Sequence, residues 1–336
     1  MSEEHMPDDL KARLKRRVPQ GALMAFREAA SWPAVLRVLG SRNKLFLRFA
    51  PPGHYYSPIP DLAAVRRNAA RIFDAPDDPG PPSLPGIDLH EAAQLERLQL
   101  FGRVHEELPF PDRPTPGFRY HLDNEWFTYG DCVALYSILR THRPRRIVEV
   151  GSGFSSAAML DLNDRFFDGS LQLTFIEPYP ERLESLLRDS DAERCTVLRA
   201  SVQDVDLDVF AQLEDGDVLF VDSSHVAKMD SDVLHLLFEV LPVLAPGVLV
   251  HFHDIPWPFE YPRAWLEQGK AWNEAYLLRA FLMYNPAFEV HWYGAFLAAR
   301  HLAALSRVLP TAVRPPSSPT TLSHSSLWLR KVADRA

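Results

Sequence analysis

The chain has 336 residues, of which 46% are hydrophobic and 24% charged, a composition typical of a globular protein with a sizeable core and unlike that of a disordered or fibrous one. Its formal net charge of −8 argues against a long electrostatic contact with nucleic acid or with an anionic membrane. Two cysteines are too few for a disulfide framework and no apolar run is long enough to span a bilayer, so we expect a cytoplasmic protein.

The first third of the chain is expected to be helical and punctuated by prolines. Helices are predicted over 61–73 and 88–108, because each opens with an aspartate that can cap it and continues with apolar residues on one face. Residues 75–86 between them are rich in proline, which removes backbone donors and fixes φ, so this stretch is predicted to be a loop or linker. We expect residues 1–125 to form an N-terminal helical, proline-rich accessory segment without a sheet of its own.

From residue 126 to residue 336 the pattern predicts one α/β domain. Apolar stretches predict strands at 146–150, 171–177, 196–199, 217–222 and 247–254. Helical stretches are predicted at 131–140, 155–166, 180–188, 230–241 and 272–284. Two further strands, 288–292 and 326–332, predict a terminal antiparallel pair. The expected fold is a doubly wound, mostly parallel seven-stranded sheet that binds its ligand at the carboxyl ends of the strands.

The end of the first predicted strand carries the most informative motif. Glu149 is followed by Gly151-Ser152-Gly153, and glycines let the backbone approach a ligand closely. Ser155-Ser156 can begin a helix whose free N–H groups face the same ligand. This arrangement indicates a site for a nucleotide-like cofactor.

The ends of the other predicted strands are polar as well. They are Glu177, the stretch 201–204, the stretch 222–225 and the stretch 251–254. In a parallel sheet these ends lie on one edge, so they are expected to meet in one crevice. Glu177 lies about one β-α-β unit after the glycine loop, where a carboxylate can accept hydrogen bonds from a ribose diol.

Over about residues 126–332, the order of these segments resembles the class I S-adenosylmethionine-dependent methyltransferases. The stretch 149–153 resembles the first motif of that family, Glu177 resembles its ribose-binding acid, and Ser201-Val202-Gln203 resembles the segment that flanks the adenine. The resemblance implies S-adenosylmethionine as cofactor. It implies cofactor contacts from Glu149, Gly151, Ser152, Gly153, Glu177, Val202, Gln203 and Asp222.

The stretches 222–225 and 246–254 resemble the motifs of small-molecule and sugar O-methyltransferases, a branch that often uses a divalent metal. Methyl transfer to a hydroxyl requires that the hydroxyl be made more nucleophilic. A metal such as Mg²⁺, held by Asp222, His253 and Asp254, would lower the pKa of the acceptor. Alternatively His225 or His253, beside Asp254, acts as the catalytic base, or the histidines are purely structural.

The acceptor is expected to be a sugar or another small metabolite. The aromatic, proline-rich loop 255–262 would either cover that acceptor or simply pack against the domain. A nicotinamide-dependent oxidoreductase is a rival interpretation, although Ser156 at the third position of the G-x-G-x-x-G pattern disfavours it. A non-catalytic binding protein with the same fold is a second rival. The sequence leaves open whether the protein is a monomer or a homo-oligomer.

Overall fold

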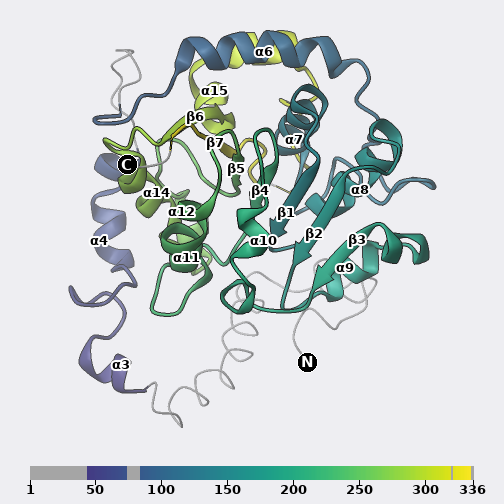
Figure 1. Cartoon of the computed structure of the whole chain (residues 1–336). Coiled ribbons are helices and arrows are strands. Elements are labelled where there is room, and N and C mark those ends of the chain that lie inside the picture. The colour runs from purple at the N-terminus through teal and green to yellow at the C-terminus, as the bar shows by residue number, and fades with distance from the viewer. Residues whose placement is uncertain (1–43, 74–83, 319–320, 334–336) are drawn as a thin grey trace, which may run out of the picture. The chain divides into compact units, whose positions relative to one another are not determined.

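A computed structural model describes residues 44–73, 84–318 and 321–333, and its centre is a seven-stranded sheet (Figure 1). The strands are β1 (Arg146–Val150), β2 (Gln172–Ile176), β3 (Cys195–Leu198), β4 (Val218–Val221), β5 (Leu249–Phe252), β6 (Phe288–Tyr293) and β7 (Leu327–Lys331). Their order in the sheet is β3-β2-β1-β4-β5-β7-β6. The first five strands are parallel, and β7 runs antiparallel to both β5 and β6. The predicted doubly wound, mostly parallel sheet with a terminal antiparallel pair is confirmed.

The register of the parallel strands aligns their carboxyl ends. Val150 pairs with Ile176 on one side and with Val221 on the other, and Val221 pairs with Phe252. All four side chains are buried, as expected for strands covered on both faces. The residues that follow these four positions therefore leave the sheet side by side, at one edge.

Helices cover both faces of the sheet (Figure 1). The main ones are α6 (Glu91–His105), α7 (Tyr129–His142), α8 (Phe154–Phe166), α9 (Glu181–Leu186), α10 (Asp208–Ala211), α11 (Asp232–His235), α12 (Leu241–Val243), α13 (Arg263–Glu267), α14 (Glu274–Leu282), α15 (Gly294–Arg300) and α16 (Leu302–Val308). From β1 the chain winds outward through β2 to β3, and from β4 it winds in the opposite direction to β5. Because crossovers are right-handed, the two directions place their helices on opposite faces. The reversal between β1 and β4 opens a crevice at the carboxyl edge.

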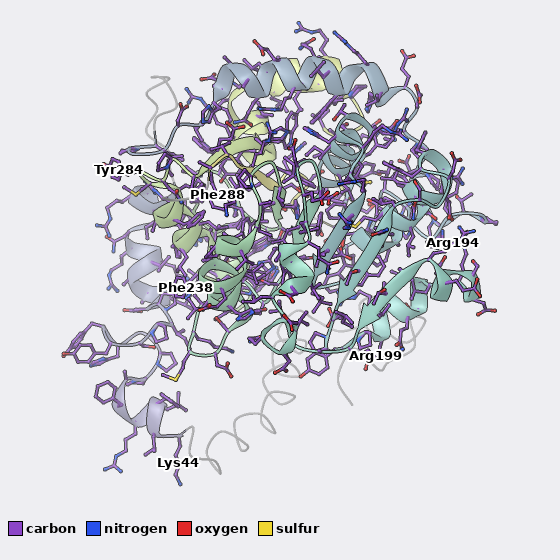
Figure 2. The ribbon with its side chains drawn as sticks, viewed as in Figure 1. Lys44, Arg194, Arg199, Phe238, Tyr284 and Phe288 are labelled. Atoms are coloured by element: carbon purple, nitrogen blue, oxygen red, sulfur yellow. The ribbon has the colours of Figure 1, made fainter. Side chains whose placement is uncertain are left out.

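The predicted helix over 230–241 is not continuous. It consists of α11, a π-helical turn at Leu236–Val240 and α12. Pro242 supplies the reason, since a proline cannot donate its backbone nitrogen and its ring crowds the carbonyl group four residues earlier, which belongs to Phe238. The Phe238 side chain points outward from this turn and is 63% exposed (Figure 2).

The first predicted helix is also divided, into α4 (Leu62–Arg67) and α5 (Ala69–Phe73). The Asp61 carboxylate accepts a hydrogen bond from the Ala63 N–H at 2.8 Å, so the predicted cap is confirmed. A shorter helix, α3 (Lys44–Phe49), precedes it. The helix predicted over 88–108 is α6, which begins three residues later than expected because His90 adopts a left-handed φ of 48°.

The described residues divide into two compact units, with the boundary between Ala69 and Ala70. The division predicted after residue 125 stays a prediction. Residues 75–83 of the predicted linker lie outside the described residues. In the described part of the chain, no helix combines the length and the apolar character needed to cross a membrane.

Candidate active site

Two adjoining cavities lie at the carboxyl edge of the sheet. The first, of about 450 Å³, is lined by the ends of β1, β2, β4 and β5 together with residues 125–127 and part of the segment 265–272. The second, of about 600 Å³, is lined by the ends of β1 to β4. The predicted site residues that line the first cavity are Gly151, Ser152, Gly153, Glu177, Asp222, His225, His253 and Asp254. Those that line the second are Gly151, Glu177, Val202, Gln203 and Asp222.

The glycine loop touches the end of β4. Gly151 has a φ of +81°, and a Cβ at this position would lie 1.7 Å from the carbonyl oxygen of Asp222. Any side chain would therefore separate the two strand ends, so the sequence requires glycine here for a reason independent of any ligand. The Ser152 N–H donates to the Glu177 carboxylate at 3.1 Å, which joins the loop to the end of β2.

Glu149 lies behind this loop and lines neither cavity, unlike the other predicted cofactor residues. Its carboxyl group is fully buried and accepts hydrogen bonds from the hydroxyls of Ser155 and Ser156. The Ser156 hydroxyl in turn accepts from the Gly153 N–H at 2.9 Å. Burial raises the pKa of Glu149 to about 8, although the two serine hydroxyls oppose the shift. Its visible role is to hold the start of α8 against the loop.

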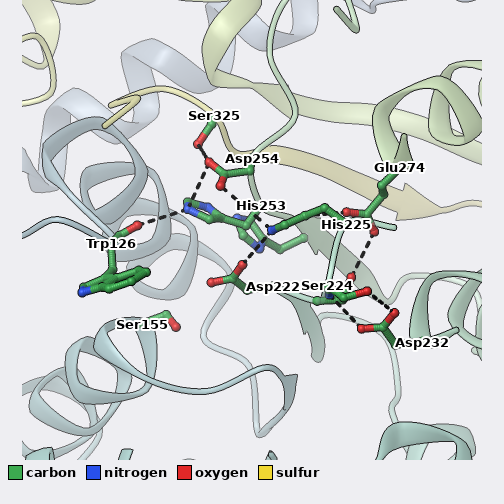
Figure 3. A network of polar contacts seen from close by, with 12 residues as sticks. Trp126, Ser155, Asp222, Ser224, His225, Asp232, His253, Asp254, Glu274 and Ser325 are labelled. Atoms are coloured by element: carbon green, nitrogen blue, oxygen red, sulfur yellow. Dashed lines mark hydrogen bonds and ion pairs between the residues drawn. The ribbon is translucent and has the colours of Figure 1, made fainter. Parts of the chain in front are cut away.

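His225 forms the centre of the first cavity's charged cluster (Figure 3). Its Nδ1 lies 2.8 Å from the carboxylate of Glu274, the first residue of α14. Its Nε2 lies 3.4 Å from a carboxylate oxygen of Asp222 and 4.0 Å from one of Asp254. Burial disfavours the charged imidazole, but the bonds to Asp222 and Glu274 outweigh it, so the pKa of His225 is raised well above its usual value.

The backbone of His225 is held by the same helix that holds its ring. Its carbonyl oxygen accepts from the N–H groups of Asn273 and Glu274 at 3.0 and 3.2 Å. The residue adopts a left-handed φ of 59°, which costs about 1 kcal/mol or more for a residue other than glycine. The contacts with Asn273 and Glu274 stabilise this conformation, and the imidazole is aimed between Asp222 and Asp254 as a result.

His251 lies in β5 and His253 just beyond its end, and their rings stack at 5.7 Å between centroids on one side, as their spacing predicts, but their surroundings differ. The His251 ring stacks on Phe220 at 3.7 Å between centroids, and burial lowers the pKa of His251 well below its usual value. His253 is buried too, yet its pKa is raised, because the nearby carboxylates, of which Asp254 and Asp222 contribute most, outweigh the loss of water. Its Nε2 lies 3.3 Å from the Trp126 carbonyl oxygen and 3.7 Å from Asp254.

Asp254 is connected to the last strand of the sheet. The Ser325 hydroxyl lies 3.1 Å from the Asp254 carboxylate (Figure 3). It also lies 3.4 Å from the Asp131 carboxylate, so it can donate to either of the two. Asp131 also accepts from the Ser326 N–H at 2.7 Å. Burial raises the pKa of Asp131 to about 6. The residues just before β7 thus fix one wall of the carboxylate cluster.

The predicted metal ligands do not form a metal-binding arrangement. Among the residues that the structure describes, no group of three or more His, Cys, Asp or Glu side chains is placed to hold a metal ion. Asp222 and Asp254 instead flank Nε2 of His225, whose raised pKa makes it the cation of this cluster. In this arrangement the two carboxylates serve as partners of the imidazole, and the metal at Asp222, His253 and Asp254 stays a prediction.

The aromatic wall of the first cavity comes from residues that the sequence interpretation did not select. Trp126, Trp265 and Trp272 line it. The favoured loop 255–262 borders a separate cavity of about 570 Å³, and its Phe259 is almost fully buried, so most of this loop packs into the domain. In the sequence, only the cluster of tryptophans between the end of β5 and α14 indicated this aromatic wall. Nothing in a single sequence places the segment 265–272 beside the cavity.

The described residues also include two cationic side chains and one carboxylate that sequence reasoning missed. Arg182 lies over the Trp126 ring at 3.7 Å, and the Lys270 ammonium lies 4.4 Å from the ring centroids of both Trp265 and Trp272. Glu274 is 1% exposed and reaches His225 from a segment 49 residues away. An acid near the start of the predicted helix 272–284 was its only sequence signal.

The chain is similar to several known proteins. A family model described as a methyltransferase domain matches residues 148–255, from β1 to just beyond β5. An uncharacterised protein of Archaeoglobus fulgidus is 37% identical over 169 residues, which is 49% of this chain and 74% of that protein. The solved O-methyltransferase TomG of Streptomyces achromogenes, in complex with S-adenosylmethionine, is 15% identical with a TM-score of 0.39, and the match covers 80% of this chain and 96% of TomG. The S-adenosylhomocysteine-bound methyltransferase PaMTH1 of Podospora anserina is 13% identical with a TM-score of 0.37. That match covers 81% of this chain and 97% of PaMTH1.

Proposed function

Because the chain belongs to the class I S-adenosylmethionine-dependent methyltransferase superfamily and S-adenosylmethionine is its cofactor, we propose that it methylates a hydroxyl oxygen of a sugar or another small metabolite. The cofactor supplies a methyl carbon that its neighbouring sulfonium makes electrophilic. The protein then has to hold the donor, align the acceptor hydroxyl and remove the proton of that hydroxyl.

The second cavity and the glycine loop are the proposed cofactor site. Gly151 lines both cavities, and its missing side chain lets the ends of β1 and β4 meet there. Glu177 lines both cavities and is suited to a ribose diol. The residues proposed to hold the cofactor are Gly151, Ser152, Gly153, Glu177, Val202, Gln203 and Asp222, whereas Glu149 supports the loop from behind.

The contact between Glu274 and His225 is the observation that carries the proposed chemistry. A buried carboxylate on Nδ1 fixes the imidazole tautomer, so that His225 presents the lone pair of Nε2 to the cavity once the Nε2 proton has left. Because the pKa of His225 is raised, this neutral form becomes more populated, and transfer faster, as pH rises. As the acceptor oxygen takes the methyl group, its proton passes to Nε2. The carboxylates of Asp222 and Asp254 then stabilise the imidazolium, and His253 helps to position Asp254.

Indole faces provide a surface for the acceptor. The rings of Trp126, Trp265 and Trp272 line the cavity that holds His225. Flat apolar faces beside polar groups suit the ring of a sugar or an aromatic alcohol and exclude water from the reaction. A cytoplasmic location remains part of this proposal.

Two measurements test the proposal. Isothermal titration should show binding of S-adenosylhomocysteine and none of a nicotinamide dinucleotide, and the reverse result would favour the oxidoreductase. With labelled S-adenosylmethionine and a panel of sugar and phenolic acceptors, His225→Gln should slow methyl transfer on the order of 10²-fold without changing cofactor affinity. Transfer at the wild-type rate by His225→Gln, together with slow transfer by His253→Ala, would move the base to His253. Cofactor binding without turnover on any acceptor would favour a non-catalytic protein.

A further inference from the structure

Lys270 lies in the wall of the first cavity, where several contacts hold it in place. Its ammonium group lies 4.4 Å from the ring centroids of both Trp265 and Trp272. Its own backbone N–H donates to the Trp265 carbonyl oxygen at 3.0 Å, which fixes the start of the side chain. The side chain is half-buried, and burial lowers the pKa of Lys270 while the charge of Asp254 opposes the shift.

Within the described residues, this ammonium group has no carboxylate within ion-pair distance. Asp254 is the carboxylate whose charge raises the pKa of Lys270. It accepts a hydrogen bond from Ser325 and lies beside His225 and His253. A partly dehydrated cation supported only by two indole faces has lost more hydration than it regains. A negatively charged group of a ligand would complete its environment.

Trp272 connects this cation to the proposed base. The His225 ring lies 4.3 Å from the Trp272 ring, and the Lys270 ammonium lies 4.4 Å from the centroid of the same ring. A small molecule that lies along Trp272 can thus place a hydroxyl at His225 and an anionic group at Lys270. The His225 ring and the Lys270 ammonium lie against the same indole and so are close enough for one compact ligand to reach both.

We propose that Lys270 binds an anionic group of the methyl acceptor, so that the acceptor is a small hydroxylated carboxylate or phosphate ester rather than a neutral alcohol. This inference rests on the proposed function, because it names the substrate class of that same site. Carboxylate and phosphate share the chemistry that an ammonium group recognises, and the probes below separate them.

Arg182, the other cation in the cavity wall, serves as the matched control. It lies over Trp126 on the glycine-loop side, where a Cβ added to Gly153 would lie 3.1 Å from its Cδ. It is also exposed, unlike Lys270. Its removal should affect the donor side of the cavity, and the preference for an anionic acceptor should remain.

The experiment compares matched pairs of anionic and neutral probes. Glucuronate and glucose 6-phosphate are titrated against glucose, and 3,4-dihydroxybenzoate against catechol, with the full chain saturated with S-adenosylhomocysteine. Binding is followed by calorimetry and by the fluorescence of the tryptophans beside Lys270. We expect at least one anionic probe to bind wild type at least 10-fold more tightly than its neutral partner. Comparing the carboxylates with the phosphate ester then identifies the preferred anion.

Substitutions test whether Lys270 causes the preference for anionic probes. Lys270→Gln should abolish it, Lys270→Arg and Arg182→Gln should keep it, and the affinity of Lys270→Gln for S-adenosylhomocysteine should equal that of wild type. The inference is overturned if wild type binds the anionic and the neutral member of every pair equally, or binds none of the probes. It is also overturned if Lys270→Gln keeps the preference for anionic probes. Failure of S-adenosylhomocysteine to bind wild type would instead count against the proposed function.

Discussion

The two sides of the first cavity are built by different kinds of contact. On the glycine-loop side, formed by the ends of β1 and β2, the backbone makes the decisive contacts: Gly151 lies against the Asp222 carbonyl group and the Ser152 N–H binds Glu177. On the histidine side, formed by the ends of β4 and β5 with α14, ionisable side chains bind one another, as in the pair His225 and Glu274. The first side provides a fixed shape, and the second provides charge that can shift with a proton.

This difference separates two tasks that a methyltransferase has to perform. The donor needs a rigid surface, because its reaction is a displacement that depends on alignment. The acceptor needs a group whose protonation changes during the reaction. Substitutions on the glycine-loop side should therefore affect binding and folding, whereas those on the histidine side should affect rate.

The largest effect is expected for Gly151→Ala. A methyl group here would overlap the Asp222 carbonyl oxygen, at 1.7 Å, and would also strain a residue with φ of +81°. We expect the free energy of unfolding to fall by about 4 kcal/mol or more and S-adenosylhomocysteine binding to be lost. Urea denaturation and calorimetry measure the two quantities.

Gly169→Ala provides the control for backbone strain alone. Gly169 has a similar φ of +73°, but an added Cβ would meet no atom within 4 Å. The free energy of unfolding of Gly169→Ala should fall by about 1 to 2 kcal/mol, and cofactor binding should stay intact. Equal effects of the two substitutions would mean that the close approach of β1 and β4 is unimportant.

Glu274→Gln should give the next largest effect, confined to the histidine side. An amide keeps the size of the side chain but no longer stabilises an imidazolium, so kcat should fall on the order of 10²-fold while cofactor affinity stays unchanged. Glu260→Gln is the matched control, because that carboxylate binds the Tyr276 hydroxyl and borders the 255–262 loop cavity instead. A wild-type kcat for Glu274→Gln would remove the proposed positioning role.

The smallest expected effect is a pH dependence of stability. The folded state raises the pKa of His225 above its unfolded value near 6.5, so the stabilisation by its protonated form is complete below that value and is lost as pH rises through the folded pKa. The difference in unfolding free energy between wild type and His225→Gln should therefore shrink from pH 6 to pH 9. His251, whose folded pKa is lowered, should show the opposite trend, with stability lost as pH falls below about 6.5. Denaturant titrations at several pH values decide this, and a difference that grows with pH would contradict the environment described for His225.

The glycine-loop side could be predicted from the sequence because its contacts follow from strand order. Once parallel strands are recognised, the residues after Val150, Ile176 and Val221 must lie together at one edge, whatever their side chains are. The cluster at Gly151, Glu177 and Asp222 is a consequence of that rule.

Most of the histidine side could not be predicted, because its contacts join segments that no periodicity relates. Glu274 reaches His225 across 49 positions, and Ser325 reaches Asp254 across 71. Nor does a sequence distinguish His251 from His253, which are two residues apart and lie on the same side but differ in their neighbours. Glu149 shows that a strong motif can also mislead. It belongs to the most informative motif of the chain, yet it supports the loop from behind and lines neither cavity.

The position of β7 has a consequence for how the protein is made. This strand lies between β5 and β6, and the residues just before it supply Ser325 to Asp254 and Ser326 to His251. During translation, β5 leaves the ribosome more than 70 residues before these partners, so its outer edge is unpaired until they emerge. The carboxyl edge of the sheet is thus completed only late in synthesis, and a polypeptide interrupted before Ser325 would expose the edge of β5 and leave Asp254 without its Ser325 contact.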